Sequence, residues 1–421
     1  MRKLYYTLAL GIFAVSCLAQ KTTGYEHMTT SLWQADLQYL KKKMDKEFNT
    51  FNPEVLVAFA EEYEALLGRL PQLKNYQVPG EIQHLFSLLK DGHTELNVGH
   101  RTVKYHRVPL SLYWFEGDFY VLAAHESYKQ LVGGKVTRIG KLSIDQAFEK
   151  LKANMSRDNE MEYLYAGPGY IVLTELLAFL EISDDPYSTT FTIETPEGRT
   201  VEQKFEGLAA ETYSKGPWAR ITDLESAETP LSRTQPGVSY WYKYLPDEKS
   251  MYFYFGRVNN QKGKPSIRTF SKKLWAEIDA IKPEKLIIDV RSNNGGNYHL
   301  SKPIWTGIKE RNWLNQPGKV WAITGRRTFS AAATFCVFLK QHTQAKIIGE
   351  VSRTHPNQSD NNEYMTLPNS GFLIEYSTRI KIHWPERPDA DRIPVDVTIT
   401  PTFEAYRAGK DLVLEYLLRK Q

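Results

Sequence analysis

Cysteine is scarce in this sequence, which holds only two among its 421 residues, Cys17 and Cys336. If Cys17 is removed together with the N-terminal segment described below, Cys336 is the only cysteine left and an intramolecular disulfide is excluded. Cys336 lies among apolar residues of an expected helix, so we predict that it is a buried core thiol and not a nucleophile.

An excess of charge of one sign is also missing, because the formal net charge is only +4. Two of the positive charges, Arg2 and Lys3, lie in the N-terminal segment, which leaves the remainder close to neutral. A near-neutral chain has no electrostatic footprint for nucleic acid, so nucleic-acid binding is not expected. The sequence also shows no low-complexity tract, no internal repeat and no group of His, Cys, Asp and Glu at ligand spacing. We therefore predict no metal and no cofactor.

What is present is the composition of a globular protein, with 42% hydrophobic and 24% charged residues. The length allows two or three domains. The aromatic content of 13% suits a large core or a groove that binds apolar side chains.

The first residues resemble a secretory signal peptide over residues 1–19. Arg2 and Lys3 precede the apolar run Leu4–Val15, and small residues follow up to Ala19. The apolar run is too short to span a bilayer comfortably. We therefore expect export across the inner membrane to a periplasmic or extracellular location.

Cys17 leaves a second interpretation of this segment open. The stretch Ala14–Cys17 is a loose version of a bacterial lipoprotein signal, in which the cysteine would be lipidated and would tether the protein to a membrane. The usual leucine three places before the cysteine is missing, so we favour ordinary cleavage after Ala19.

Residues 20–102 are expected to be mainly helical. Apolar residues recur at helical spacing, and Asn52 and Pro53 form a cap followed by proline in a first turn. A last helix runs into Asp91-Gly92-His93-Thr94, where Gly92 is a natural helix stop. Isolated histidines in loops are usually solvated or structural, but Asp91 and Thr94 are placed to orient the His93 imidazole.

Residues 103–206 change character, since short strand patterns alternate with turns and helical pieces. The expected strands are Val108–Phe115, Phe119–Ala124, Gly134–Ile139 and Thr189–Glu194, and the expected helices are Ile144–Leu151 and Ile171–Leu180. We interpret this unit as a peptide-binding or lid module that could fold alone. Residues 207–249 contain several prolines and are predicted to be an irregular connection.

From residue 250 onwards, strands and helices alternate in the rhythm of a largely parallel sheet. The expected strands are Met251–Phe255, Lys285–Val290, Val320–Ile323 and Ala345–Gly349. Ligands of such sheets bind beyond the carboxyl ends of the strands. The Gly295-Gly296 turn and Ser330 both follow strand ends, so we expect them to share one site.

Ser330 stands at a junction of strand, turn and helix. The start of a helix offers unpaired N–H groups and the positive end of its dipole, which together stabilise an oxyanion. The plain alternative is that Ser330 only caps a core helix.

Six motifs in order resemble the S41 serine peptidases, the group of C-terminal processing proteases and tricorn-type core proteases. They are Asp91–Thr94, Leu286–Arg291 with Asn294–Gly296, Thr328–Ala332, Ile347–Glu350, Leu367–Gly371 and Pro394–Asp396. The resemblance implies an α/β fold with α+β elements: an N-terminal helical bundle, a PDZ-like insertion over residues 103–206 and a ClpP/crotonase-like catalytic core over residues 250–421.

The resemblance also implies roles for single residues. Ser330 would be the nucleophile, and the oxyanion hole would use the backbone N–H of Ala331 and that of Gly295 or Gly296. Asp289, Arg291 and Asn294 would be scaffold for the glycine turn.

Two branches of the family use different general bases. One uses a lysine downstream of the serine, and here that position holds His355. The tricorn-type branch uses a histidine in the upstream helix–strand turn, which matches His93, although its preceding serine is replaced by Gly92. A histidine is a competent base at neutral pH. Our hypothesis is therefore that His93 activates Ser330 and that His355 lines the cleft, with the exchange of these roles as the alternative.

The acid that would orient the base is open, and Glu386 and Asp389 are the candidates from the loop before the C-terminal tail. The function implied is a secreted serine peptidase that takes an extended peptide by strand addition. The alternative is an inert peptide- or ligand-binding protein on the same fold, favoured by Gly92 and by Ala333, where the family often carries glutamate. Substrate, cleavage specificity and oligomeric state are not predicted.

Overall fold

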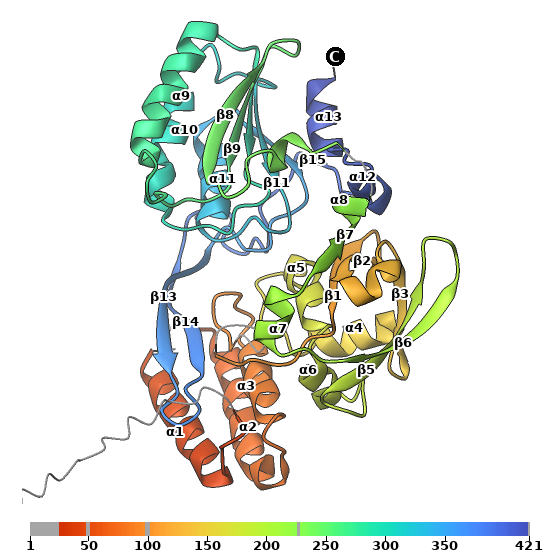
Figure 1. Ribbon diagram of the computed structural model, residues 1–421. Coiled ribbons are helices and arrows are strands. Elements are labelled where there is room, and N and C mark those ends of the chain that lie inside the picture. The colour runs from red at the N-terminus through yellow and green to blue at the C-terminus, as the bar shows by residue number, and fades with distance from the viewer. Residues whose placement is uncertain (1–24, 48–50, 97–101, 225–227, 420–421) are drawn as a thin grey trace, which may run out of the picture.

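The computed structural model describes residues 25–47, 51–96, 102–224 and 228–419. The predicted signal segment therefore lies outside the described residues. The described chain forms two lobes (Figure 1). The N-terminal lobe holds residues 25–47, 51–96 and 102–220, and the C-terminal lobe holds residues 240–357 and 382–419. A hairpin of residues 358–381 extends from the second lobe to the first.

The C-terminal lobe is built on a six-stranded sheet with the strand order β15-β12-β11-β10-β9-β8. Its strands are β8 (Tyr240–Leu245), β9 (Ser250–Phe255), β10 (Lys285–Asp289), β11 (Val320–Thr324), β12 (Lys346–Gly349) and β15 (Val397–Thr398). All neighbouring pairs are parallel except β8 with β9, which is antiparallel at the sheet edge. The predicted parallel sheet is therefore confirmed.

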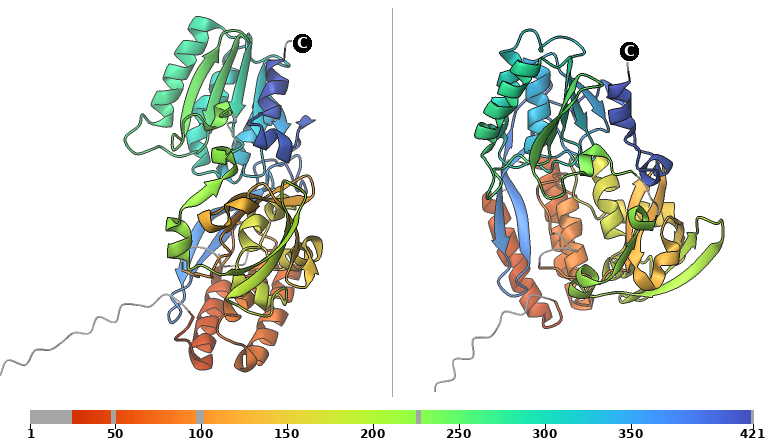
Figure 2. Two further views of the ribbon diagram at one scale, coloured as in Figure 1. Left: turned by 45° about the vertical axis from the view of Figure 1, so that its right-hand side comes forward. Right: turned by 45° about the horizontal axis from the view of Figure 1, so that its top comes forward.

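Helices cover both faces of this sheet, which is why its central strands are apolar throughout. Helices α9 (Ile267–Ile281), α10 (Lys302–Lys309) and α11 (Ala331–His342) bury one face in a shared core. Helix α13 (Leu412–Leu418) packs on the other face with Val413, Leu414 and Leu417 (Figure 2). Cys336 is fully buried in α11, as predicted, and burial raises the pKa of its thiol to about 12.

The N-terminal lobe begins with α1 (Thr30–Glu47), α2 (Pro53–Arg69), a short 3-10 turn η1 (Leu70–Gln72) and α3 (Val78–Ser87). The predicted cap is confirmed, because the side chain of Asn52 accepts a hydrogen bond from the N–H of Glu54, and Pro53 begins the helix.

An antiparallel sheet of seven strands completes this lobe. Its strands are β1 (Leu110–Phe115), β2 (Asp118–His125), β3 (Lys135–Ile139), β4 (Leu142–Ser143), β5 (Ser188–Glu194), β6 (Thr200–Glu206) and β7 (Trp218–Arg220). The accompanying helices are η2 (Glu126–Leu131), α4 (Ile144–Lys152), α5 (Met161–Tyr170), α6 (Thr174–Phe179), α7 (Ala210–Lys215) and α8 (Ile221–Leu224). The four predicted strands and the first predicted helix are confirmed. The second predicted helix is wrong at its start, because the chain turns between α5 and α6.

Two expectations about this region are corrected. Residues 207–249 are not irregular throughout, because β7 pairs with β2 and β8 pairs with β9. The described residues between β7 and β8 include α8 and the short η3 (Leu231–Arg233). The insertion is also not a module with a core of its own. Residues of α1, α3 and the antiparallel sheet, such as Leu37, Ile82 and Val121, belong to one hydrophobic cluster.

The hairpin of β13 (Gln358–Thr366) and β14 (Leu373–Lys381) runs beside α1 (Figures 1 and 2). Its turn is fixed by Asp36 of α1, whose carboxylate oxygens accept the N–H groups of Asn369 and Ser370 at 2.8 Å each. The Phe372 ring packs against Trp33 with centroids 5.7 Å apart. The motif Leu367–Gly371 is therefore the turn that ties the two lobes together.

The remaining elements of the C-terminal lobe are the short 3-10 turn η4 (Tyr298–Ser301), which precedes α10, and α12 (Phe403–Arg407), which precedes α13. Among the described helices, none combines the length and the apolar character that a membrane span requires.

Candidate active site

Ser330 directly precedes α11, at the end of the turn that follows β11. Its backbone is strained, with φ 51° and ψ −125°, a region that non-glycine residues rarely adopt and that costs of order 1–3 kcal/mol. Its side chain makes no capping hydrogen bond to the helix and is partly exposed. The side chain is therefore not the helix cap that the plain alternative requires, and it is partly exposed beside the strained turn.

Gly295 lies directly against the Ser330 turn. A Cβ at position 295 would come within 2.9 Å of the Ser330 Cβ and 3.0 Å of the Ala331 nitrogen, and the residue has φ 98°. The N–H of Phe329 donates to the main-chain oxygen of Asn293 at 3.1 Å, which joins the two turns. The prediction that both turns share one site is therefore confirmed, and only glycine fits there.

The two glycines of the turn differ in what their amides do. The N–H of Gly295 donates to the side-chain oxygen of Asn293 at 2.8 Å and is already used. In the part of the chain that the structure describes, the N–H groups of Gly296 and Ala331 have no hydrogen-bond partner. They are the two donors beside Ser330 that remain for an oxyanion.

The fold carries His93 to this site. Its ring stacks on the ring of Phe329, the residue before Ser330, with centroids 4.3 Å apart and an interplanar angle of 21°. The side chain is almost fully buried, and neither ring nitrogen has a hydrogen-bond partner among the residues that the structure describes. A neutral imidazole in this state keeps a lone pair with which it can accept a proton.

The carboxylates near the ring are not those expected from the sequence. Glu386 and Asp389 are exposed. The Oδ1 of Asp91 lies 3.9 Å from the His93 Nδ1 and accepts the N–H of His93 at 3.2 Å. Asp158, from the turn before α5, accepts the N–H of Gly92 at 2.6 Å.

Asp91, His93 and Asp158 are also the described residues whose arrangement could hold a cation, because their ligand atoms lie within 4.8 Å of one another. The sequence showed no such group, since Asp158 is far from the other two in the chain. Both carboxylates also accept hydrogen bonds from the protein.

His355 contacts a main-chain oxygen of the N-terminal lobe. Its Nε2 lies 2.6 Å from the main-chain oxygen of Asp158. Because a carbonyl oxygen only accepts, this nitrogen carries the proton. The structure therefore places His355 beside the segment that holds Gly92, and Phe329 contacts the other candidate base, His93.

Besides Asp158, three further residues at the site were missed from the sequence: Arg353, Glu162 and Tyr165. The Arg353 guanidinium lies 3.8 Å from the centre of the Phe329 ring and 4.2 Å from that of Tyr165, and it forms a buried ion pair with Glu162. Burial raises the pKa of Glu162, against the opposing effect of Arg353. The ion pair joins residues 191 positions apart, so no local pattern could have indicated it.

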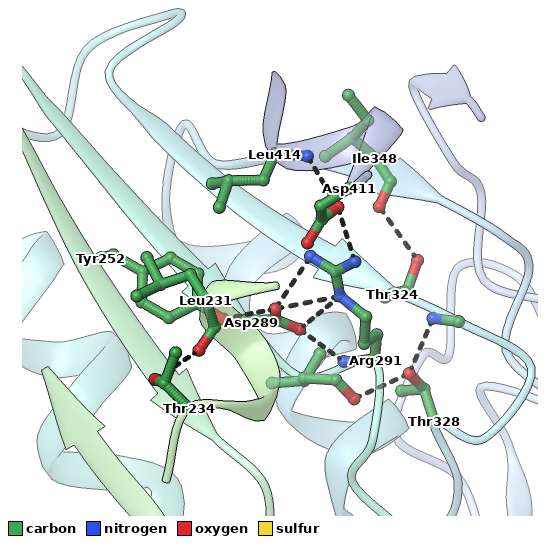
Figure 3. Close-up of polar contacts among 12 residues, drawn as sticks. Leu231, Thr234, Tyr252, Asp289, Arg291, Thr324, Thr328, Ile348, Asp411 and Leu414 are labelled. Atoms are coloured by element: carbon green, nitrogen blue, oxygen red, sulfur yellow. Dashed lines mark hydrogen bonds and ion pairs between the residues drawn. The ribbon is translucent and has the colours of Figure 1, made fainter. Parts of the chain in front are cut away.

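Asp289 at the end of β10 and the neighbouring Arg291 belong to a largely buried network of charged groups (Figure 3). Arg291 donates through Nε to both oxygens of Asp289, at 3.0 and 2.9 Å, and through a terminal nitrogen to Asp411 at 2.8 Å. The Tyr252 hydroxyl donates to Asp289 at 2.7 Å. These contacts hold the end of β10 in place, and the predicted scaffold role of Asp289 and Arg291 for the glycine turn stays a prediction.

Asn294 contacts the missed residues of this site. Its side-chain oxygen accepts from Arg353 and its amide donates to the Tyr165 hydroxyl, both at 3.4 Å. It therefore connects the glycine turn with α5 of the N-terminal lobe.

Comparisons with known proteins agree at the level of the fold. No family model and no curated protein matches the sequence. A crystal structure of a serine-to-alanine mutant of CPAF is similar over 92% of this chain and 96% of its own, with a TM-score of 0.64 and 12% identity. Mature CPAF covers the same shares, with a TM-score of 0.61 and 14% identity.

The photosystem II D1 C-terminal processing protease also matches over 93% of this chain and 97% of its own, with 13% identity and a TM-score of 0.40. CPAF is an S41-family peptidase, so the structure comparison agrees, at the level of the fold, with the resemblance that the six motifs indicated. The chain has the α/β fold of the S41 peptidases.

Proposed function

We propose that this protein is a serine-type peptidase in which Ser330 is the nucleophile and His93 the general base. The amides of Ala331 and Gly296 would bind the oxyanion. The observation that carries the proposal is the convergence at Ser330 of a strained backbone, a glycine turn in contact with it and an imidazole stacked on the preceding residue.

Each group has a step to perform in this mechanism. The Ser330 oxygen attacks the carbonyl carbon of the peptide while His93 takes the hydroxyl proton, and the carbonyl oxygen becomes negative beside the two amides. When the C–N bond breaks, His93 gives the proton to the leaving amine. A water molecule then attacks the acyl-enzyme through the same base, which restores the serine and releases the acid.

The substrate that we propose is an extended polypeptide. A strand that is added to a sheet edge supplies main-chain hydrogen bonds without a requirement for sequence. The fold neighbours named as peptidases support a peptide or protein substrate, and one related structure is mature CPAF complexed with lactacystin.

The test is hydrolysis of fluorescently labelled casein by the chain without residues 1–19. We expect Ser330→Ala and His93→Ala each to lower kcat by at least about 10⁴-fold, because nucleophile and base act as a unit. His355→Ala should keep most of the activity. Loss of activity in His355→Ala with a fully active His93→Ala would reverse the assignment of the base.

The alternative is a catalytically inert peptide-binding protein on the same fold. Its supporting observation is that neither nitrogen of His93 is hydrogen-bonded to Ser330 in this structure. Catalytic hydrogen bonds are often formed only in the substrate complex, so we favour the peptidase. A protein that binds labelled casein with unchanged affinity in wild type and Ser330→Ala, and cleaves it in neither, would establish the alternative.

We also propose that the protein is exported, with cleavage after Ala19. The support is the basic and apolar pattern of residues 1–19. Mass spectrometry of the mature N-terminus tests it. A lipidated Cys17 as first residue would replace this proposal with a membrane tether.

A further inference from the structure

Asp158 is a charged residue at the site that has no step in the proposed reaction. It lies in the turn before α5, in the N-terminal lobe, and is partly buried. One carboxylate oxygen accepts the N–H of Gly92 at 2.6 Å, and the other accepts the hydroxyl of Thr354. Its main-chain oxygen accepts the Nε2–H of His355.

These contacts join segments that are distant in the sequence. Gly92 is 66 positions from Asp158, and Thr354 is 196 positions away in the C-terminal lobe. An ionised carboxylate only accepts hydrogen bonds, and here each oxygen has a donor from a different segment. Asp158 therefore fixes the distance between the turn that carries His93 and the loop after β12.

The position of Gly92 is shaped by this carboxylate. A Cβ at residue 92 would lie 3.0 Å from the Asp158 Oδ1, a separation that is tight for a side chain. The backbone of Gly92 is not in the left-handed region, so its glycine is explained by the close approach and not by its conformation. The absence of a side chain at residue 92, directly before His93, therefore leaves space for the Asp158 carboxylate.

Other charged groups also face His93. Asp91 lies on its own turn, and the buried pair of Glu162 and Arg353 lies beside Phe329. Asp91 is held to the main chain of the same turn, and the charge of Glu162 is compensated by Arg353. Asp158 is the carboxylate that connects the His93 turn with the lobe of Ser330.

We propose that Asp158 is a positioning residue for His93. It holds the imidazole in register with Ser330 across the lobe boundary, and its negative charge favours the imidazolium that forms when His93 takes the serine proton. This inference rests on the proposed function and adds to it the group that orients the base.

The test compares Asp158→Asn with wild type in casein hydrolysis. Asparagine has the same size but no charge, and it can accept well from only one of the two donors. We expect kcat to fall about 10- to 100-fold, which is the range for groups that orient a metal-ligating histidine, while KM changes less than about threefold. The exposed Asp184, which pairs with Lys141, gives a matched control in Asp184→Asn with wild-type kinetics.

A binding measurement separates positioning from a general loss of structure. In Ser330→Ala protein, the affinity for labelled casein should be the same with and without Asp158→Asn, because Asp158 is not expected to touch the substrate. Weaker binding together with a lower urea midpoint would mean that Asp158 only holds the structure, and would overturn the proposal.

A second variant approaches the contact from the other side. Gly92→Ala places a methyl group against the carboxylate without backbone strain, and we expect a smaller fall in kcat, about threefold to tenfold, at constant KM. A wild-type kcat in both Asp158→Asn and Gly92→Ala would also overturn the proposal. So would a fall in kcat that occurs only in Glu386→Gln or Asp389→Asn. A wild-type protein that does not cleave casein would instead refute the proposed function itself.

Discussion

The two lobes contribute to the site in different ways. The C-terminal lobe supplies Ser330, Ala331 and the glycine turn from consecutive strand ends of one parallel sheet. The N-terminal lobe supplies His93, Asp91 and Asp158 from turns that have no common sheet. The nucleophile and its amides therefore form by local folding, whereas the base reaches them only when the lobes pack together.

This difference makes the contacts between the lobes as important as the reacting groups. Among them are the ion pair of Glu162 with Arg353, the carboxylate of Asp158 with Thr354, and the hairpin turn on Asp36. A protein built in this way can hold its nucleophile turn intact and still lose its base.

The largest expected effect concerns Cys336, which lies in the core of the C-terminal lobe. Since burial raises the pKa of its thiol to about 12, the thiolate fraction at neutral pH is about 1000-fold below that of an ordinary cysteine. We expect iodoacetamide to modify the chain without residues 1–19 at least 1000-fold more slowly when folded than in urea.

The same reaction tests whether the lobes unfold together. If they form one cooperative unit, alkylation of Cys336 and loss of helical circular dichroism follow the same urea transition. Alkylation at a free-thiol rate in the native protein would contradict the buried position of Cys336.

The second effect is the loss of the ion pair between the lobes. Arg353→Met leaves the buried Glu162 without its partner, which typically costs about 3–5 kcal/mol of unfolding free energy. Because burial raises the pKa of Glu162, the cost is small at low pH, where the carboxyl is protonated, and grows as the pH rises through the pKa. Urea denaturation at several pH values measures it.

The matched control for this prediction removes both charges. Glu162→Met combined with Arg353→Met should recover most of the stability, because no buried charge then stays unpaired. An equal loss in the single and double variants at all pH values would assign the effect to packing on Phe329.

The third effect concerns the glycine turn. Gly295→Ala places a methyl group against Ser330 and the Ala331 nitrogen, so we expect kcat to fall about 10²- to 10³-fold, as for the loss of an oxyanion donor. Gly263 is a matched control, since it also has a positive φ of 75° but open space around its Cβ position. Gly263→Ala should lose some stability and keep its kcat, whereas equal effects on kcat would contradict the placement of the oxyanion hole.

The extent to which the site was predictable follows the same division between lobes. Ser330 and Gly295 could be placed together because the carboxyl ends of neighbouring parallel strands meet at one edge. His93 was found only because its turn resembles a family motif. Asp158 and Glu162 were missed, since a residue at the start of an ordinary helix gives no local signal of a partner in the other lobe.

The fold was predicted with the same strengths and weaknesses. The parallel strands are apolar throughout and have a clear signature, so they were recognised. The β13–β14 hairpin was not predicted, because Gln358–Thr366 is mostly polar. The hairpin lies beside α1 and is not covered on both faces like the strands of the parallel sheet (Figure 1). The acids Glu386 and Asp389 were selected by their place in the chain, which says nothing of exposure.

The smallest expected effect is a pH dependence confined to the N-terminal lobe. The His106 Nδ1 lies 2.6 Å from Oε1 of the buried Glu175, and this hydrogen bond raises the pKa of His106 despite the opposing effect of burial. Its contribution to stability is therefore complete below the ordinary histidine pKa of about 6.5 and is lost as the pH rises through the raised value. Between pH 6 and pH 8.5 we expect the unfolding free energy of wild type to fall by about 1 kcal/mol or less relative to that of His106→Gln, as measured by urea denaturation.

The control variant is His84→Gln. His84 contacts a main-chain carbonyl of Ala153 instead of a carboxylate, so His84→Gln should keep the pH dependence of wild type. Parallel pH dependences of wild type and His106→Gln would mean that the contact with Glu175 contributes equally to stability in both protonation states of His106. The two lobes would then differ only in the catalytic groups that they supply.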